Sequence, residues 1–170
     1  MRRLMLLRHA KSDHPAGVAD HDRQLTARGR RDSSAMGRYM AEEGLVPDLA
    51  IVSPARRTQE TWELVDAALG RDVLRHDERR IYEASTSSLL AVINKADPMV
   101  ASLLLVGHNP GIHALALRLT GPGGHPDQNQ LQQFPTAGLV VIDFDTESWS
   151  DVTTSFGKLE RFVQPKPDLD

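Results

Sequence analysis

The stretch Leu4-Met5-Leu6-Leu7-Arg8-His9-Ala10 joins a short apolar run to a basic pair. A continuous apolar run of this length is typical of a strand that is buried on both faces of a parallel sheet. Side chains that directly follow such a strand lie at its carboxyl end, where open α/β sheets gather their functional groups. The stretch therefore predicts an α/β fold and makes Arg8 and His9 candidate functional residues.

Strand-like and helix-like segments alternate along the rest of the chain. Apolar runs predict further strands over residues 49–52, near 73–75, over 102–106 and 138–144, with a sixth over 149–156. Helical spacing and end signals predict helices from Thr26 to Gly44, from Pro54 to Gly70, from Ser85 through Lys95 and from Pro110 to about Leu119. Residues 11–24 and 120–135 are predicted loops, and residues 164–167 an extended tail.

This order of elements predicts the architecture. Strands that alternate with helices form a mostly parallel sheet covered by helices on both faces. We therefore expect residues 1–170 to form a single domain, a three-layer α/β/α sandwich with about six strands in its central sheet.

Composition excludes several classes of function. The net charge of -3 gives no overall basic footprint for nucleic acid, and the absence of cysteine excludes disulfides, thiolate catalysis and Cys-based metal sites. The apolar run before Arg8 is shorter than the roughly seven residues of a secretory leader, and no stretch reaches the roughly eighteen of a membrane span. We expect a soluble, cytoplasmic and monomeric protein with no membrane partner.

Three groups of chemically active residues follow three predicted strands: Arg8-His9, the segment from Ser53 to Arg57, and Gly107-His108-Asn109. Arginine binds phosphate oxygens in pairs, and neutral imidazole is a good nucleophile near neutral pH. Arginines at the start of a helix oppose its dipole unless an anion is present. Each group alone also has a structural explanation, as solvated residues, surface ion pairs or a helix cap.

The order of the motifs resembles the histidine phosphatase superfamily. Four elements carry the resemblance over about residues 4 to 145: Leu-Leu-Arg8-His9-Ala, Leu25-Thr-Ala-Arg-Gly29, Ser53-Pro-x-x-Arg57-x-x-x-Thr61 and Val106-Gly-His108-Asn-Pro. The short chain, Ile81-Tyr82-Glu83-Ala84 and Phe134-Pro135-Thr136-Ala137 resemble the SixA-type phosphohistidine phosphatases. The sequence after His9 departs from the mutase branch.

The resemblance implies a phosphatase that forms a phosphohistidine on His9 and needs no metal or other cofactor. Arg8 and Arg57 would hold the phosphoryl oxygens, His108 would complete the cationic cage, and Thr136 would bind substrate. The substrate would be a phosphorylated protein, through phosphohistidine, or a small phosphorylated molecule. Whether His108 is neutral or charged stays open.

The acid for a phosphoester leaving group is also open. Glu83 is the candidate implied by the resemblance, with an exposed loop carboxylate as the alternative, and Asp13 is a second candidate. A phosphohistidine substrate would need no strong acid. Two other classes remain as alternatives: a phosphate-binding adaptor without catalysis, and a metalloenzyme built on some of the seven histidines.

Overall fold

The apolar run that opens the chain lies in β1 (Arg2–Arg8), inside a six-stranded sheet ordered β3-β2-β4-β1-β5-β6. The computed structural model describes residues 1–121, 125–154 and 156–165. The other strands are β2 (Leu49–Val52), β3 (Leu74–Asp77), β4 (Ser102–Gly107), β5 (Leu139–Phe144) and β6 (Lys158–Val163). The first four strands are mutually parallel, whereas β5 runs antiparallel to β1 and β6 antiparallel to β5.

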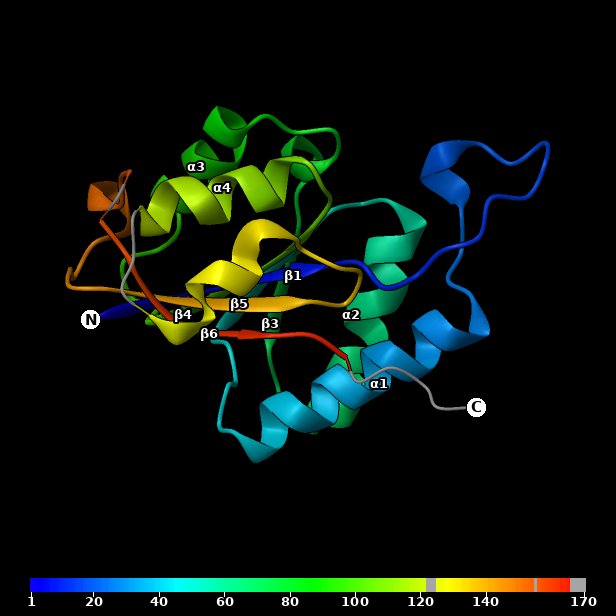
Figure 1. The fold of residues 1–170 in the computed structure, drawn as a ribbon, viewed down its shortest axis with the longest axis horizontal. Helices are drawn as coiled ribbons and strands as arrows, with labels where there is room; N and C mark the ends of the chain where they lie inside the picture. The colour runs from blue at the N-terminus through cyan, green and yellow to red at the C-terminus, as the bar shows by residue number, and fades with distance from the viewer. Residues whose placement is uncertain (122–124, 155, 166–170) are drawn as a thin grey trace.

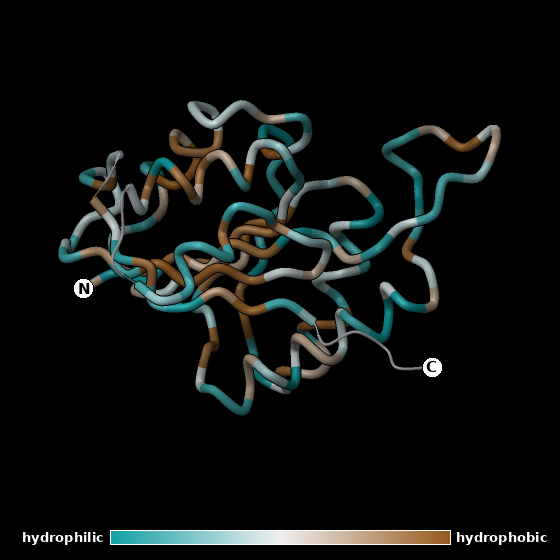
Figure 2. The backbone as a smooth tube through the Cα atoms, in the orientation of Figure 1, coloured by the Kyte–Doolittle hydropathy of each residue, from teal (hydrophilic) through white to brown (hydrophobic). Residues whose placement is uncertain are grey.

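Helices cover both faces of this sheet (Figure 1). The helices are α1 (Ala27–Glu42), α2 (Arg56–Leu69), α3 (Thr86–Asn94) and α4 (Gly111–Thr120). One core joins α3 and α4 to alternate residues of the central strands, among them Leu4 and Leu6. The second core joins α1 and α2 to the residues that alternate with Leu4 and Leu6 along β1, which are Met5 and Leu7. The run is apolar throughout because successive side chains enter opposite cores, and Figure 2 shows the hydrophobic centre of the sheet. The three-layer α/β/α prediction is confirmed.

The parallel register brings three strand ends together at one edge of the sheet. Arg8 pairs with Gly107, and Val52 pairs with Val106. Beyond the strands, the His9 amide donates to the Gly107 carbonyl at 3.1 Å, and the Ser53 amide donates to the Val106 carbonyl at 3.1 Å. The three candidate groups therefore follow adjacent strands, as the sequence predicts.

Two predictions about the C-terminal third of the chain are wrong. The sixth strand is β6, not residues 149–156, because Trp149 begins the short 3-10 helix η4 (Trp149–Asp151) and buries its indole, which donates to the Val100 carbonyl. The predicted loop 120–135 contains the 3-10 helix η3 (Pro126–Gln132). The third strand is Leu74–Asp77, an edge strand with exposed side chains. The predicted tail extends into residues 166–167, which lie outside the described residues.

No helix in the described ranges is long and apolar enough to cross a membrane.

Two further 3-10 helices, η1 (Asp20–Asp22) and η2 (Arg79–Ile81), complete the fold. Figure 1 shows η1 in the long blue loop that extends from the carboxyl end of β1 before the chain enters α1.

The start of α1 is fixed against this loop. Thr26 is the N-cap and its hydroxyl accepts from the Gly29 amide at 3.0 Å, as predicted. The Thr26 amide donates to the Lys11 carbonyl at 2.9 Å. A Cβ on Gly29 would overlap that same carbonyl. The small residue therefore lets α1 pack directly on the segment that follows His9.

We expect Gly29→Ala to lower the free energy of unfolding by about 3 kcal/mol, because backbone atoms cannot move aside without shifting α1 or the loop. Gly44→Ala is the comparison, since Gly44 has open space around it and only its φ of 69° opposes a side chain. That change should cost about 1 kcal/mol. Denaturant titration measures both, and equal losses would contradict the steric account.

Candidate active site

His9 lies directly after β1 and is only 7% exposed. Its Nδ1 lies 2.8 Å from the Ala10 carbonyl oxygen, which can only accept, so Nδ1 carries the proton. The other ring nitrogen, Nε2, then holds a free lone pair. The pKa of His9 is lowered to about 4, mainly by burial and also by the positive charges of Arg57, Arg8 and Arg23, whereas the hydrogen bond to Ala10 acts in the opposite direction. The fold thus holds His9 as a neutral, oriented nucleophile.

Two arginines flank this imidazole, and each is fixed by a backbone carbonyl. Arg8 donates through Nη1 to the Phe134 carbonyl at 3.0 Å. Arg57, 6% exposed in the first turn of α2, donates through Nη1 to the Asp20 carbonyl at 2.8 Å. Burial and the charge of Arg57 lower the pKa of Arg8.

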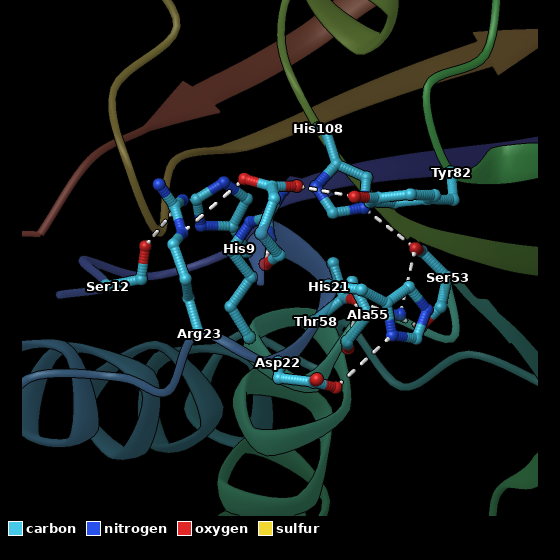
Figure 3. Close-up of polar contacts among 12 residues, drawn as sticks. His9, Ser12, His21, Asp22, Arg23, Ser53, Ala55, Thr58, Tyr82 and His108 are labelled. Carbon is cyan, nitrogen blue, oxygen red and sulfur yellow. Dashed lines mark hydrogen bonds and ion pairs between the residues drawn. The ribbon is translucent and has the colours of Figure 1, made fainter. Parts of the chain in front are cut away.

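His108 faces His9, with ring centroids 5.3 Å apart. Its Nε2 lies 2.7 Å from the Ser53 hydroxyl, a contact that Figure 3 shows as a dashed line. The Ser53 hydroxyl can donate to Nε2 or accept from it, so this contact orients the His108 ring without fixing its tautomer. The pKa of His108 is lowered to about 3, mainly by burial and also by the charges of His9 and Arg57. The low pKa makes His108 neutral in the free protein, which answers the question of charge that the sequence left open.

Three nitrogens of these side chains are buried without a hydrogen-bond partner in the described part of the chain: Arg8 Nε, Arg57 Nε and His108 Nδ1. Buried donors are normally satisfied, so a group of orphaned donors at one place needs an explanation. Arg8, His9, Arg57 and His108 all line one cavity of about 290 Å³. A phosphoryl group bound in this cavity would lie against these four side chains, and arginine is the side chain that best binds its oxygens.

Comparison with known proteins agrees with this geometry. The sequence model of the histidine phosphatase superfamily (branch 1) matches residues 4–85. The uncharacterized protein Rv1276c of Mycobacterium tuberculosis is 32% identical over 163 residues, which are 94% of this chain and 100% of that protein. The chain belongs to the histidine phosphatase superfamily.

Two solved structures support the placement within this superfamily. A protein of Nakamurella multipartitia, proposed to be the phosphohistidine phosphatase SixA, superimposes with a TM-score of 0.82 at 27% identity over 96% of each chain. A protein of Agrobacterium tumefaciens with the same proposed identity gives 0.81 at 28% identity, over 96% of this chain and 98% of the other. The chain is therefore a SixA-like histidine phosphatase, and its family favours an enzyme over a phosphate-binding adaptor.

The structure of this histidine phosphatase shows which of the remaining candidate residues line a cavity at the site. Thr136 lines the cavity that holds His9. Glu83, exposed and at a positive φ of 56°, lines a neighbouring cavity of about 290 Å³ that shares Arg57 and His108 with the first. Asp13 lines neither cavity. Arg56 is exposed and donates to Gln24, away from both.

Sequence analysis missed several residues that complete the site. Arg23 lines the His9 cavity and donates to the Ser12 hydroxyl at 3.0 Å. Asp20 contacts Arg57, and Tyr82 packs its ring 5.5 Å from that of His108. Asp20 and Arg23 lie in a polar loop without a recognisable motif. Their position just before Leu25-Thr26 was the only signal in the sequence that could have identified them. Tyr82 lies in the SixA-like segment but was given no role.

A metal centre has no support in the described ranges, where no group of three or more His, Asp or Glu side chains is placed to hold an ion. The histidines His9 and His108 instead pair with a backbone carbonyl and a hydroxyl.

The two buried histidines predict how stability depends on pH. Their pKa values are about 4 and 3 in the folded chain, against about 6.5 when unfolded, so between pH 6.5 and 4 the unfolded chain binds more protons. Stability should therefore fall as pH drops through this window, by up to about 1.4 kcal/mol per pH unit for each histidine. Denaturant titrations of wild type and of the His9→Asn/His108→Asn double variant measure it. Equal slopes in both proteins would contradict the assignment.

Proposed function

We propose that this histidine phosphatase hydrolyses phosphohistidine on protein substrates through a covalent phosphohistidine on His9. The observation that carries the proposal is the neutral imidazole with a free Nε2, held among buried arginine and histidine nitrogens that lack partners. In this account Arg8, Arg57 and His108 bind the phosphoryl oxygens, and Thr136 contacts the substrate from the edge of the cavity.

In the first step the Nε2 lone pair of His9 attacks phosphorus in line with the leaving group. The new N–P bond forms as the bond from phosphorus to the substrate nitrogen breaks, and the substrate imidazole leaves with a proton already on its ring. Charge spreads over the equatorial oxygens of the transferring group, where fixed donors stabilise it most. His9 keeps its Nδ1 proton on Ala10 throughout.

In the second step water attacks phosphorus of the phosphohistidine. The N–P bond to His9 breaks, its electron pair returns to Nε2, and phosphate leaves with the oxygen and both protons of the water, one of which moves to a phosphoryl oxygen. A neutral His108 and two anchored arginines serve both steps without rearrangement.

The substrate class is inferred from the site and from the relatives. A cavity rimmed by Lys11, His14 and Arg23 opens on His9, which suits a phosphorylated side chain on a protein surface. The similar solved proteins are proposed phosphohistidine phosphatases. A small phosphoester is the second candidate, and the specific observation in its favour is Glu83 in the adjoining cavity, where it would protonate a leaving oxygen.

We further propose that residues 1–170 act as one catalytic domain. A monomeric state, a cytoplasmic location and the lack of nucleic-acid or membrane partners stay predictions.

His9→Ala should remove turnover of a phosphohistidine peptide, because no other group offers a free lone pair at that position. Lys11→Ala, a change at the rim of the same cavity, controls for altered access and should retain most of the activity. Comparable turnover by His9→Ala and wild type would overturn the mechanism. If wild type hydrolyses only small phosphoesters, the phosphohistidine assignment fails while the chemistry at His9 stands.

Glu83→Gln separates the two substrate classes. If Glu83 is the acid, the change should slow hydrolysis of phosphoserine, whose alkoxide leaving group needs a proton, by about a hundredfold. Hydrolysis of a phosphohistidine peptide and of p-nitrophenyl phosphate should change little, because neither leaving group needs a strong acid. Glu147→Gln, at the opposite end of β1, is the matched control. An equal loss on all three substrates would contradict an acid role for Glu83.

A further inference from the structure

Asp20 links the loop after β1 to the phosphate-binding edge. Its carboxylate accepts from Arg57 Nη2 at 3.2 Å, and its backbone carbonyl accepts from Arg57 Nη1 at 2.8 Å. The same carboxylate oxygen, Oδ2, accepts from the Tyr82 hydroxyl, and Arg23 Nε lies 3.6 Å from Oδ1. One exposed residue of η1 thus contacts three side chains around the site.

These contacts use a particular edge of the Arg57 guanidinium. A guanidinium has five N–H donors, and the Nη1/Nη2 edge faces away from the edge formed by Nε and Nη2. Asp20 takes the first edge. The second keeps one proton on Nη2 and the buried Nε that has no partner among the described residues. Asp20 thus leaves the other donors of Arg57, which lines the His9 cavity, for a phosphoryl group.

Tyr82 donates to the Asp20 carboxylate and also packs against neighbouring side chains. Its ring lies edge-on to His108, with centroids 5.5 Å apart, and the Arg57 guanidinium carbon lies 6.0 Å from the Tyr82 ring centroid. His21 packs on the outer side of the same ring at 5.0 Å. Tyr82 therefore holds Asp20 at a fixed distance from both Arg57 and His108.

We propose that Asp20 is a positioning residue that orients the Arg57 guanidinium toward the phosphoryl group, with Tyr82 holding Asp20 in place. The inference rests on the proposed role of Arg57 and adds a residue that touches neither the phosphoryl group nor His9. Without Asp20, the buried Arg57 guanidinium would lack these hydrogen bonds and could rotate. Its orientation matters most in the transition state, because catalysis depends most strongly on donor geometry there.

The opposite role would make Asp20 an internal anion that competes with substrate for Arg57. Two features argue against competition. Asp20 occupies only the Nη1/Nη2 edge, and one of its two contacts is made by the backbone carbonyl, which carries no full charge. The two roles predict opposite signs when the carboxylate is removed.

Steady-state hydrolysis of a phosphohistidine peptide and of p-nitrophenyl phosphate tests the proposal, because neither leaving group needs a strong acid and both reactions report on transfer to His9. Asp20→Ala should lower kcat by about tenfold to a hundredfold, the effect of one lost charged hydrogen bond, with a smaller change in KM. Asp20→Asn keeps an acceptor oxygen and should recover much of the loss. Tyr82→Phe should also lower kcat, by a smaller factor than Asp20→Ala. Asp22→Ala, in the same turn, is the control that should match wild type.

A double-variant cycle distinguishes positioning from a general effect on folding. If Asp20 acts through Arg57, the Asp20→Ala/Arg57→Ala variant should be no slower than Arg57→Ala alone. Titration with vanadate, which adopts the five-coordinate geometry of transfer, should show weaker binding to Asp20→Ala than to wild type. Melting temperatures check that each variant is folded.

Three results would overturn the inference. Multiplicative losses in the double variant would show that Asp20 does not act through Arg57. A gain in kcat/KM or in vanadate affinity for Asp20→Ala would show a competing anion. Turnover by Asp20→Ala equal to wild type would show that the contact has no role. If Arg57→Ala itself retains full turnover, the proposed phosphate site fails first, and this outcome is distinct from the other three.

Discussion

The site depends on keeping two imidazoles neutral beside two guanidinium groups, of which that of Arg57 is buried and that of Arg8 half-buried. Four positive charges at these spacings would repel one another, and burial at the carboxyl edge of the sheet already disfavours charge on His9 and His108. The Ala10 carbonyl also fixes the tautomer of His9, and the Ser53 hydroxyl orients the His108 ring. The result is a site with permanent positive charge from arginine and an unprotonated nucleophile, which is the combination that attack on a phosphoryl group requires.

The rest of the fold serves this arrangement through backbone contacts. Adjacent parallel strands deliver His9, Ser53 and His108 to one edge, and Thr61 connects two of the segments by accepting from the Ala10 amide and donating to the Arg57 carbonyl. The Phe134 carbonyl accepts from both Arg8 and Asn109. In the described structure Arg8, Arg57 and His108 are thus each held by one hydrogen-bond partner and have another nitrogen without a partner. Preorganisation of this kind reduces the rearrangement needed in the transition state.

The sequence could predict the sheet, the helix starts and the strand-end residues because these depend on local patterns. The run from Leu4 to Leu7 alternates between two cores, and Thr26 caps α1 within its own turn. The sixth strand was misplaced because the burial of Trp149 comes from its contact with Val100, far away in the chain. Asp20 and Tyr82 are 62 residues apart and meet only in the fold, so no spacing could link them. The charge state of His108 likewise depends on burial and on the nearby side chains of His9 and Arg57.

The central claim is that His9 carries the phosphoryl group during turnover. A rapid-quench experiment with radiolabelled substrate, followed by peptide mapping, tests it most directly. We predict label on the peptide that contains His9, stable in base and lost in acid, that forms and decays at rates consistent with turnover. Turnover without any labelled enzyme, or label that maps to another residue, would contradict the account.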